Sequence, residues 1–223
     1  MDTTKCIAAA ATLALLIAGV GEARATPVSV SLYGLTGARA EGLDTSIERI
    51  NSQHNAILSP IGSTLGAGVG LRVRVSERLT LSFDRQSASK RSDRLGAGKN
   101  CHDFYYECWP DYQYDTYSVT VESHTNQLGV IYWTSVSPRA RAGLSASVGT
   151  YRSESFYRID IVGGESTYGS TQDTSVGVGV AGALDVKILS LLHLEAGAGF
   201  RQAKTQDLDW TGPFLQVGPA LYF

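Results

Sequence analysis

The side-chain types best suited to nucleophilic catalysis meet at Glu122-Ser123-His124. A hydrolase needs a nucleophile, a base and an orienting acid within hydrogen-bond reach. Neighbouring residues of a strand point to opposite faces, and no serine lies two positions from His124 on its own face. The remaining histidines have no local serine partner either: His54, His102 and His193. The sequence therefore predicts no catalytic residues.

Other chemical signatures are also missing from the sequence. We find no zinc-ligand spacing, no Walker loop and no dinucleotide fingerprint, because the Gly-x-Gly repeats fall inside alternating segments instead of preceding helices. The formal net charge of -2 and the lack of a basic stripe argue against nucleic acid as a partner. We expect no metal and no cofactor.

A set of charged residues recurs at every second position of glycine-rich segments. If these segments are strands, the charges share one face. Unpaired charges are costly in a low dielectric, so we expect a paired network on that face. The network either acts as a polar plug, which we favour, or lines a narrow ion path. Its predicted members are Arg72, Arg74, Asp84, Asp185, Lys187, His193, Glu195 and Arg201.

The first 25 residues have the features of a cleaved signal peptide. Lys5 supplies the positive start, residues 7–20 form an uncharged, mostly apolar stretch, and Ala23-Arg24-Ala25 matches a cleavage site. The apolar stretch is short for a membrane-spanning helix. We therefore expect residues 1–25 to be the signal peptide and residues 26–223 to be the mature domain.

A loop rich in aromatic residues is a candidate recognition surface. Export removes Cys6 and leaves Cys101 and Cys108, and an even pair in an oxidising compartment favours a disulfide. Exposed tyrosine and tryptophan are typical anchors of recognition surfaces. The alternative is that the rings pack on each other and on the neighbouring strands. The candidate contact residues are Tyr105, Tyr106, Trp109, Tyr112 and Tyr114.

The elements that would position these residues are β-strands. Apolar side chains alternate with glycine, alanine or charged residues, most clearly over 176–188. The tiny and charged residues suit the interior of a narrow barrel better than the wet face of a sandwich. Alternation in 117–133 changes phase, which predicts a bulge near Asn126-Gln127. The expected strands are 27–38, 62–75, 79–89, 117–133, 140–157, 173–188, 191–203 and 213–223.

Short and long connections alternate along the chain. Short turns follow the second, fourth and sixth strands, and long loops follow the others, as a transmembrane barrel requires. The segments 112–133 and 139–161 exceed the bilayer and are expected to project as a sheet whose edge could take up a partner strand. We predict a closed, antiparallel, eight-stranded, all-β transmembrane barrel in meander order. Ten strands is the alternative, with a hairpin hidden in one of the first two long loops.

The chain ends with Leu221, Tyr222 and Phe223. This ending resembles the C-terminal signal of bacterial outer-membrane β-barrels, which the barrel-assembly machinery reads in that family. In length and layout the mature chain resembles a small barrel of the OmpA/OmpX type. The resemblance implies a location in the bacterial outer membrane, with the lipid bilayer and lipopolysaccharide as surroundings.

The expected function follows from this resemblance and from the absence of a catalytic group. We expect a non-enzymatic barrel that displays four extracellular loops and serves surface interaction, adhesion or envelope integrity. Two alternatives stay open: an outer-membrane enzyme that modifies lipid A, and a narrow porin-like channel.

Overall fold

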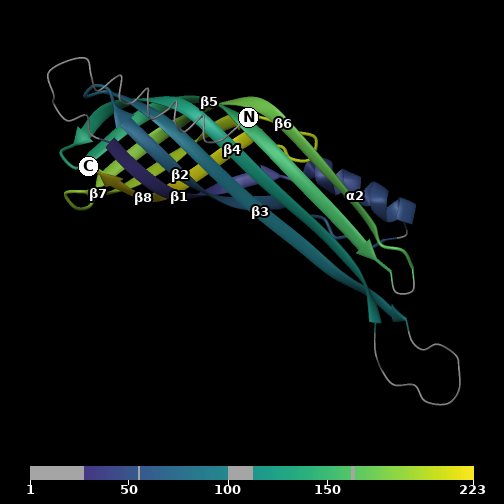
Figure 1. The fold of residues 1–223 in the computed structure, drawn as a ribbon. Helices are drawn as coiled ribbons and strands as arrows, with labels where there is room; N and C mark the ends of the chain where they lie inside the picture. The colour runs from purple at the N-terminus through teal and green to yellow at the C-terminus, as the bar shows by residue number, and fades with distance from the viewer. Residues whose placement is uncertain (1–27, 55, 100–112, 162–163) are drawn as a thin grey trace, which may run out of the picture.

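The computed structural model describes residues 28–54, 56–99, 113–161 and 164–223. Eight antiparallel strands and one helix make up this part of the chain (Figure 1). The predicted signal peptide of residues 1–25 lies outside the described residues. The elements are β1 (Val28–Arg39), α2 (Glu41–His54), β2 (Ser63–Arg74), β3 (Leu79–Lys99), β4 (Gln113–Ser137), β5 (Ala140–Asp160), β6 (Thr167–Lys187), β7 (Leu192–Gln202) and β8 (Gly212–Tyr222).

The sheet closes on itself between the first and last strands. Each strand pairs with the next along the chain, and β1 pairs with β8 through Val30 opposite Leu221 and Gly34 opposite Val217. Closure satisfies the backbone groups that an edge would leave bare in lipid. The predicted eight-stranded meander is confirmed. The ten-strand alternative is wrong, since the ring closes with eight strands, the first long connection holds helix α2, and β3 and β4 pair directly on either side of the second.

No helix within the described ranges is long and apolar enough to cross a membrane.

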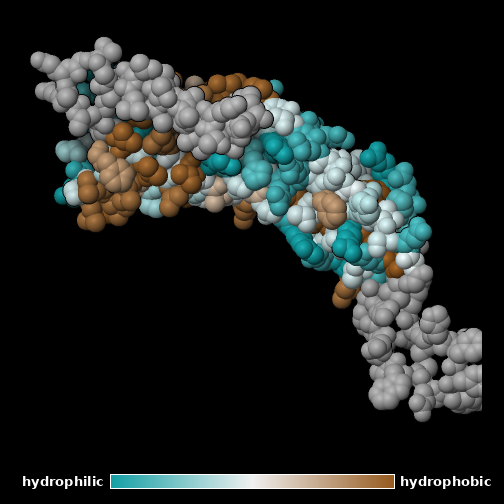
Figure 2. All heavy atoms as spheres, viewed as in Figure 1, coloured by the Kyte–Doolittle hydropathy of each residue, from teal (hydrophilic) through white to brown (hydrophobic). Residues whose placement is uncertain are grey.

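The wall of the barrel is apolar outside and polar or small inside. Leu32, Val148 and Val178 point outward and are exposed, whereas Ser29, Ser31 and Arg72 point inward and are buried. Figure 2 shows apolar side chains gathered over the barrel end and hydrophilic ones over the opposite end of the molecule. An apolar outer wall is typical of a barrel whose outside contacts lipid.

Strand β4 changes its chemistry without changing its register. Val119 and Val121 are 1% and 0% exposed and point inward, while Leu128 is 60% exposed and points outward. Pairing with β5 runs unbroken from Thr116 opposite Asp160 to Ser135 opposite Arg141. The predicted bulge near Asn126-Gln127 is therefore wrong. The apolar face switches sides because the strand passes from an apolar surrounding into water, where apolar residues belong inside.

Strands β3 to β6 extend well beyond their neighbours. The pairing of β2 with β3 ends at Ala88, and the pairing of β7 with β6 ends at Val178, so the remaining lengths form a four-stranded sheet that we call the projecting sheet (Figure 1). It comprises 89–99, 113–125, 152–160 and 167–177. The sequence predicts projection only for the middle two strands.

Helix α2 covers the inner face of the projecting sheet. Leu43 and Ile47 are buried, and Ile50 packs beside them in one cluster with Val119 and Ile159. Asp44 fixes the chain after the helix by accepting hydrogen bonds from the backbone N–H groups of Ile61 at 2.6 Å and Gly62 at 3.0 Å. Gly62 has a positive φ of 72°, a conformation that favours glycine.

Candidate functional site

The lumen holds a buried ion pair centred on Arg72. Its guanidinium donates to Asp84 Oδ1 at 2.9 Å and lies 3.8 Å from Glu195 Oε2. The hydroxyl of Tyr33 donates to the same Asp84 oxygen at 2.9 Å. Strands β1, β2, β3 and β7 supply these residues, so the pair ties together walls that are distant in sequence.

A second buried cluster is centred on Asp185. Its Oδ1 lies 2.7 Å from His193 Nδ1, and its Oδ2 accepts from the guanidinium of Arg141. The hydroxyl of Tyr222 lies 3.0 Å from Glu195 Oε1 and 3.3 Å from Asp185 Oδ2, and thereby links the two clusters. Together they form the lumen network: Tyr33, Arg72, Asp84, Arg141, Asp185, His193, Glu195 and Tyr222.

The structure departs from the predicted network at several positions. Lys187 is exposed at the short-turn end, where the side chain reaches water, so its inclusion is a wrong prediction. Arg74 is partly exposed at the same end, and its Nε has no hydrogen-bond partner. Arg201 joins neither ion-pair cluster and reaches Tyr33 through Gln86. Sequence reasoning missed Tyr33, Arg141 and Tyr222, although their alternation with outward apolar residues places them on the inward face.

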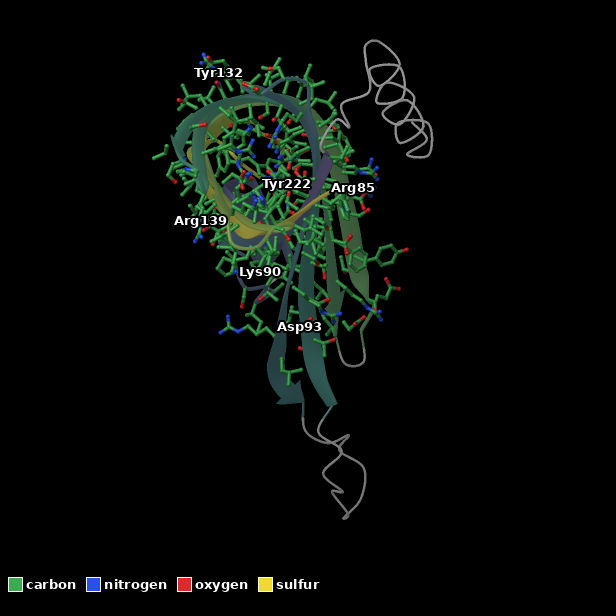
Figure 3. All side chains as sticks on the ribbon, turned by 90° about the vertical axis from the view of Figure 1, so that its left-hand side faces the viewer. Arg85, Lys90, Asp93, Tyr132, Arg139 and Tyr222 are labelled. Atoms are coloured by element: carbon green, nitrogen blue, oxygen red, sulfur yellow. The ribbon has the colours of Figure 1, made fainter. Side chains whose placement is uncertain are left out.

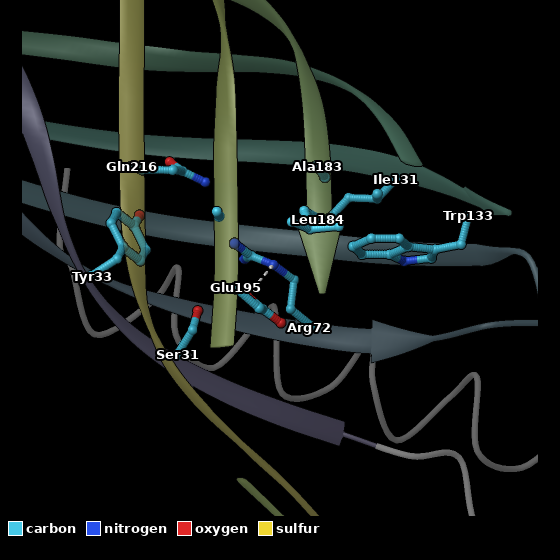
Figure 4. A pocket seen from close by; sticks show the side chains of 10 residues that line it. Ser31, Tyr33, Arg72, Ile131, Trp133, Ala183, Leu184, Glu195 and Gln216 are labelled. Carbon is cyan, nitrogen blue, oxygen red and sulfur yellow. Dashed lines mark ion pairs between the residues drawn. The ribbon is translucent and has the colours of Figure 1, made fainter. Parts of the chain in front are cut away.

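Little space remains between the side chains of the lumen. A cavity of about 30 Å³ lies beside Arg72, Glu195 and Gln216, the size of one water molecule (Figure 4). Figure 3 looks along the barrel and shows side chains filling the ring, with Tyr222 inside and Tyr132 outside. Toward the long-loop end the apolar cluster of Val121, Leu208 and Trp210 follows. This arrangement resembles a plug more than a pore.

Glu122, Ser123 and His124 do not assemble a catalytic group. Ser123 is buried on the inner face, while His124 lies on the outer face with its Nε2 3.9 Å from Glu122 Oε2. A proton cannot pass directly between side chains on opposite faces of one strand. Among the described residues, no three histidine, cysteine or acidic side chains are placed to hold a metal ion.

The outer face of the projecting sheet carries exposed aromatic residues among ion pairs. Phe156 is 43% exposed and Tyr168 is 73% exposed. Register places Arg158 opposite Tyr168, and Arg158 Nε lies 2.8 Å from Asp160 Oδ2. Sequence reasoning assigned Phe156 to the projecting strands but did not single out this pair, because the connection before β6 gave no signal of strand.

The predicted recognition loop falls mostly outside the described residues. Cys101, Cys108, Tyr105, Tyr106, Trp109 and Tyr112 all lie there, so the disulfide stays a prediction. The backbone of Tyr114 pairs with Gly98 at the start of β4. Strand β3 ends before this loop at Lys99, and β4 begins after it at Gln113.

The predicted C-terminal assembly signal occupies the closing strand. Leu221 and Phe223 are exposed, and Tyr222 points into the lumen network. The backbone N–H of Phe223 donates to Val28 O at 2.9 Å, which joins the end of the chain to the start of β1.

The described residues form a closed, antiparallel, eight-stranded meander with an apolar outer belt and a charged lumen. Comparison with solved structures finds the same fold. Ail, the attachment invasion locus protein of Yersinia pestis, superposes with a TM-score of 0.54 at 10% identity, over 89% of this chain and 99% of that chain. Neisserial surface protein A gives 0.49 at 13% identity, over 88% and 96%. The N-terminal barrel of Pseudomonas aeruginosa OprF gives 0.44 at 12% identity, over 89% and 98%. No protein-family model and no curated protein matches the sequence.

Proposed function

We propose that this protein resides in the bacterial outer membrane and binds a partner at the cell surface through its projecting sheet. The exposed pair of Phe156 and Tyr168 carries the proposal. The two residues lie on the polar, long-loop side of the apolar belt, where water surrounds them. Large apolar side chains held in water on a rigid sheet are typical of binding surfaces.

The neighbourhood of the pair fits a recognition surface. Phe156 lies opposite Ser170 and Tyr168 lies opposite Arg158, so the rings are diagonal neighbours on β5 and β6. Aromatic and arginine side chains are enriched among the residues that dominate interface energies. The predicted recognition loop, with Tyr105, Tyr106, Trp109, Tyr112 and Tyr114, would extend this surface at the tip of β3 and β4.

The interior of the barrel supports a role outside the lumen. Conduction would require a path past the lumen network and the apolar cluster that follows it, and an eight-stranded barrel is barely wide enough for its own side chains. The separation of Ser123 from His124 supports a non-enzymatic function over modification of lipid A. The lipid bilayer and lipopolysaccharide would surround the belt, and Leu221, Tyr222 and Phe223 would be read by the barrel-assembly machinery.

Binding of intact cells to host-cell or matrix-coated surfaces tests the proposal. The double variant Phe156→Ser with Tyr168→Ser should lower the number of bound cells at least tenfold, since each anchor contributes about 1–2 kcal/mol or more. The control is Tyr132→Ser, an exposed tyrosine near the short-turn end, which should leave binding unchanged. Normal heat-modifiability on gels shows that each variant is folded. Equal binding by all three proteins would contradict the role of the sheet.

Protease treatment of intact cells tests the location separately. Cleavage confined to the projecting sheet and the long loops is expected, with the barrel protected. Uniform digestion, or no protein in the outer-membrane fraction, would overturn the outer-membrane assignment.

A further inference from the structure

Arg201 is a buried cation that pairs with no carboxylate of the described residues. It points inward from β7 and is 3% exposed. Its Nη2 donates to the carbonyl oxygens of Thr36 at 2.8 Å and Gly37 at 3.3 Å, and its Nη1 lies 3.5 Å from Gln86 Oε1. The guanidinium stacks over Phe214 at 5.3 Å from the ring centre. All these contacts are with neutral groups.

The charges of the lumen do not balance. Among the described inward-facing residues of the barrel, three carboxylates face four arginines: Asp84, Asp185 and Glu195 against Arg72, Arg74, Arg141 and Arg201. Arg72 and Arg141 form ion pairs with the carboxylates, and Arg74 is partly exposed to solvent. Arg201 keeps an unbalanced positive charge in a buried site, which is costly.

The buried carboxylate on the long-loop side does not neutralise Arg201. Asp207 accepts from the hydroxyls of Ser155 at 2.8 Å and of Thr171, and it forms no ion pair with Arg201. These hydrogen bonds hold the segment before β8 against the projecting sheet.

Among the described residues, four buried polar groups on Arg201 and at the nearby start of the projecting sheet have no hydrogen-bond partner. They are Arg201 Nε, the Tyr151 hydroxyl, Thr125 Oγ1 and Ser175 Oγ. Register makes Thr125, Tyr151 and Ser175 direct neighbours across β4, β5 and β6.

The ring of Tyr151 reaches toward β7. A Cβ built on Gly177 would lie 2.7 Å from Tyr151 Cε2 and 2.4 Å from the Cβ of Ala203. Ala203 is the next inward residue after Arg201, so the Tyr151 ring lies beside the position that follows Arg201 on β7. An anion between the two side chains would gain hydrogen bonds from unpartnered donors and would also neutralise the charge of Arg201.

We propose that the barrel binds one small monovalent anion of the halide class between the guanidinium of Arg201 and the hydroxyl of Tyr151. Water would satisfy the hydroxyls but leave the charge of Arg201 unbalanced. The same guanidinium holds the carbonyls of Thr36 and Gly37, where β1 loses regular pairing with β2 before α2 begins. Anion binding therefore stabilises the junction between the barrel and helix α2.

Halide dependence of stability tests the proposal on the refolded, full-length mature protein in detergent. Thermal unfolding is followed while sodium bromide replaces sodium gluconate at constant ionic strength. A ligand that binds only the folded state raises the unfolding midpoint. We expect a saturable rise for the unaltered protein. For Tyr151→Phe the half-saturating bromide concentration should be about tenfold higher or more, because the hydrogen bond from a hydroxyl to an anion is lost.

A matched arginine control separates the site from general salt effects. Arg152→Gln removes an exposed arginine that pairs with Glu154, and should keep the full bromide response. Arg201→Gln should lose it. If Arg201→Gln does not fold, Tyr151→Phe and anomalous diffraction from bromide in crystals of the unaltered protein decide. Identical responses of the unaltered protein and Tyr151→Phe, or a water without anomalous signal beside Arg201, would overturn the anion site.

Discussion

The hydroxyl of Tyr222 lies 3.0 Å from Glu195 Oε1 and joins the last strand of the barrel to the lumen network. Tyr222 also stacks against His193 at 4.1 Å between ring centres, and Arg141 Nη2 lies 3.1 Å from its hydroxyl. One side chain of the terminal segment thus contacts both ionic clusters. The closing strand is held from inside the lumen as well as by its backbone pairs.

Removing this hydroxyl should weaken the barrel. Tyr222→Phe leaves Glu195 and Asp185 without a shared donor, and we expect a loss of about 1–3 kcal/mol in the free energy of unfolding. Urea unfolding of the refolded protein in detergent measures it. Tyr132→Phe is the control, since its hydroxyl is on the outer surface and accepts a hydrogen bond from Arg78 at 3.3 Å, and it should cost less than about 0.5 kcal/mol. Equal losses would argue against the linking role.

The two carboxylates beside Arg72 should not be equivalent. Asp84→Asn removes the closer partner at 2.9 Å, and Glu195→Gln removes one at 3.8 Å. Breaking a buried pair costs about 3–5 kcal/mol, so we expect that range for Asp84→Asn and a smaller loss for Glu195→Gln. The urea midpoints and heat-modifiability of both variants test this order. A larger loss for Glu195→Gln would contradict it.

Helix α2 should unfold separately from the barrel. Ile47 is buried against the projecting sheet, and Ile47→Ala should cost about 2–5 kcal/mol of local stability. The helix should then become sensitive to trypsin, for example after Arg49, while the barrel stays heat-modifiable. Glu48→Ala, an exposed change in the same helix, should leave digestion unaltered. Loss of heat-modifiability in Ile47→Ala would show instead that helix α2 and the barrel unfold together.

The tip of β5 should respond to acid. Hydrogen bonds from Ser166 and Arg158 hold the pKa of Asp160 below its usual value of 3.8. A lowered folded pKa means that the ionised carboxylate stabilises the tip above the unfolded pKa, and that this contribution is lost as pH falls through the folded pKa. Carboxyl NMR titration of the folded protein should therefore place its midpoint below 3.8.

Ser166→Ala provides the comparison for this titration. It removes the hydrogen bond that the Ser166 hydroxyl donates to Asp160 at 2.6 Å, and should raise the titration midpoint of Asp160 toward the usual value. An unmoved midpoint would show that Ser166 does not hold the carboxylate.

Period-two alternation, together with the alternating lengths of the connections, favoured eight strands in meander order and assigned the inward face of the spanning segments. That signal is strong because lipid outside and a narrow lumen inside demand opposite side chains at successive positions. Arg72, Asp84 and Glu195 could be assigned to the lumen for this reason. Helix α2 went unrecognised, although Leu43, Ile47 and Ile50 are spaced as one helical face.

Only the tertiary structure decided how these parts meet. The partners of Arg72 and the isolation of Arg201 depend on which strands face one another across the lumen, and no local pattern encodes that. From the sequence, the phase change in β4 was interpreted as a bulge. A regular strand that passes from an apolar surrounding into water produces the same change, because its apolar residues move from the outer to the inner face. Val121 is buried on the inner face where water surrounds the strand, and Leu128 is exposed on the outer face where the surrounding is apolar.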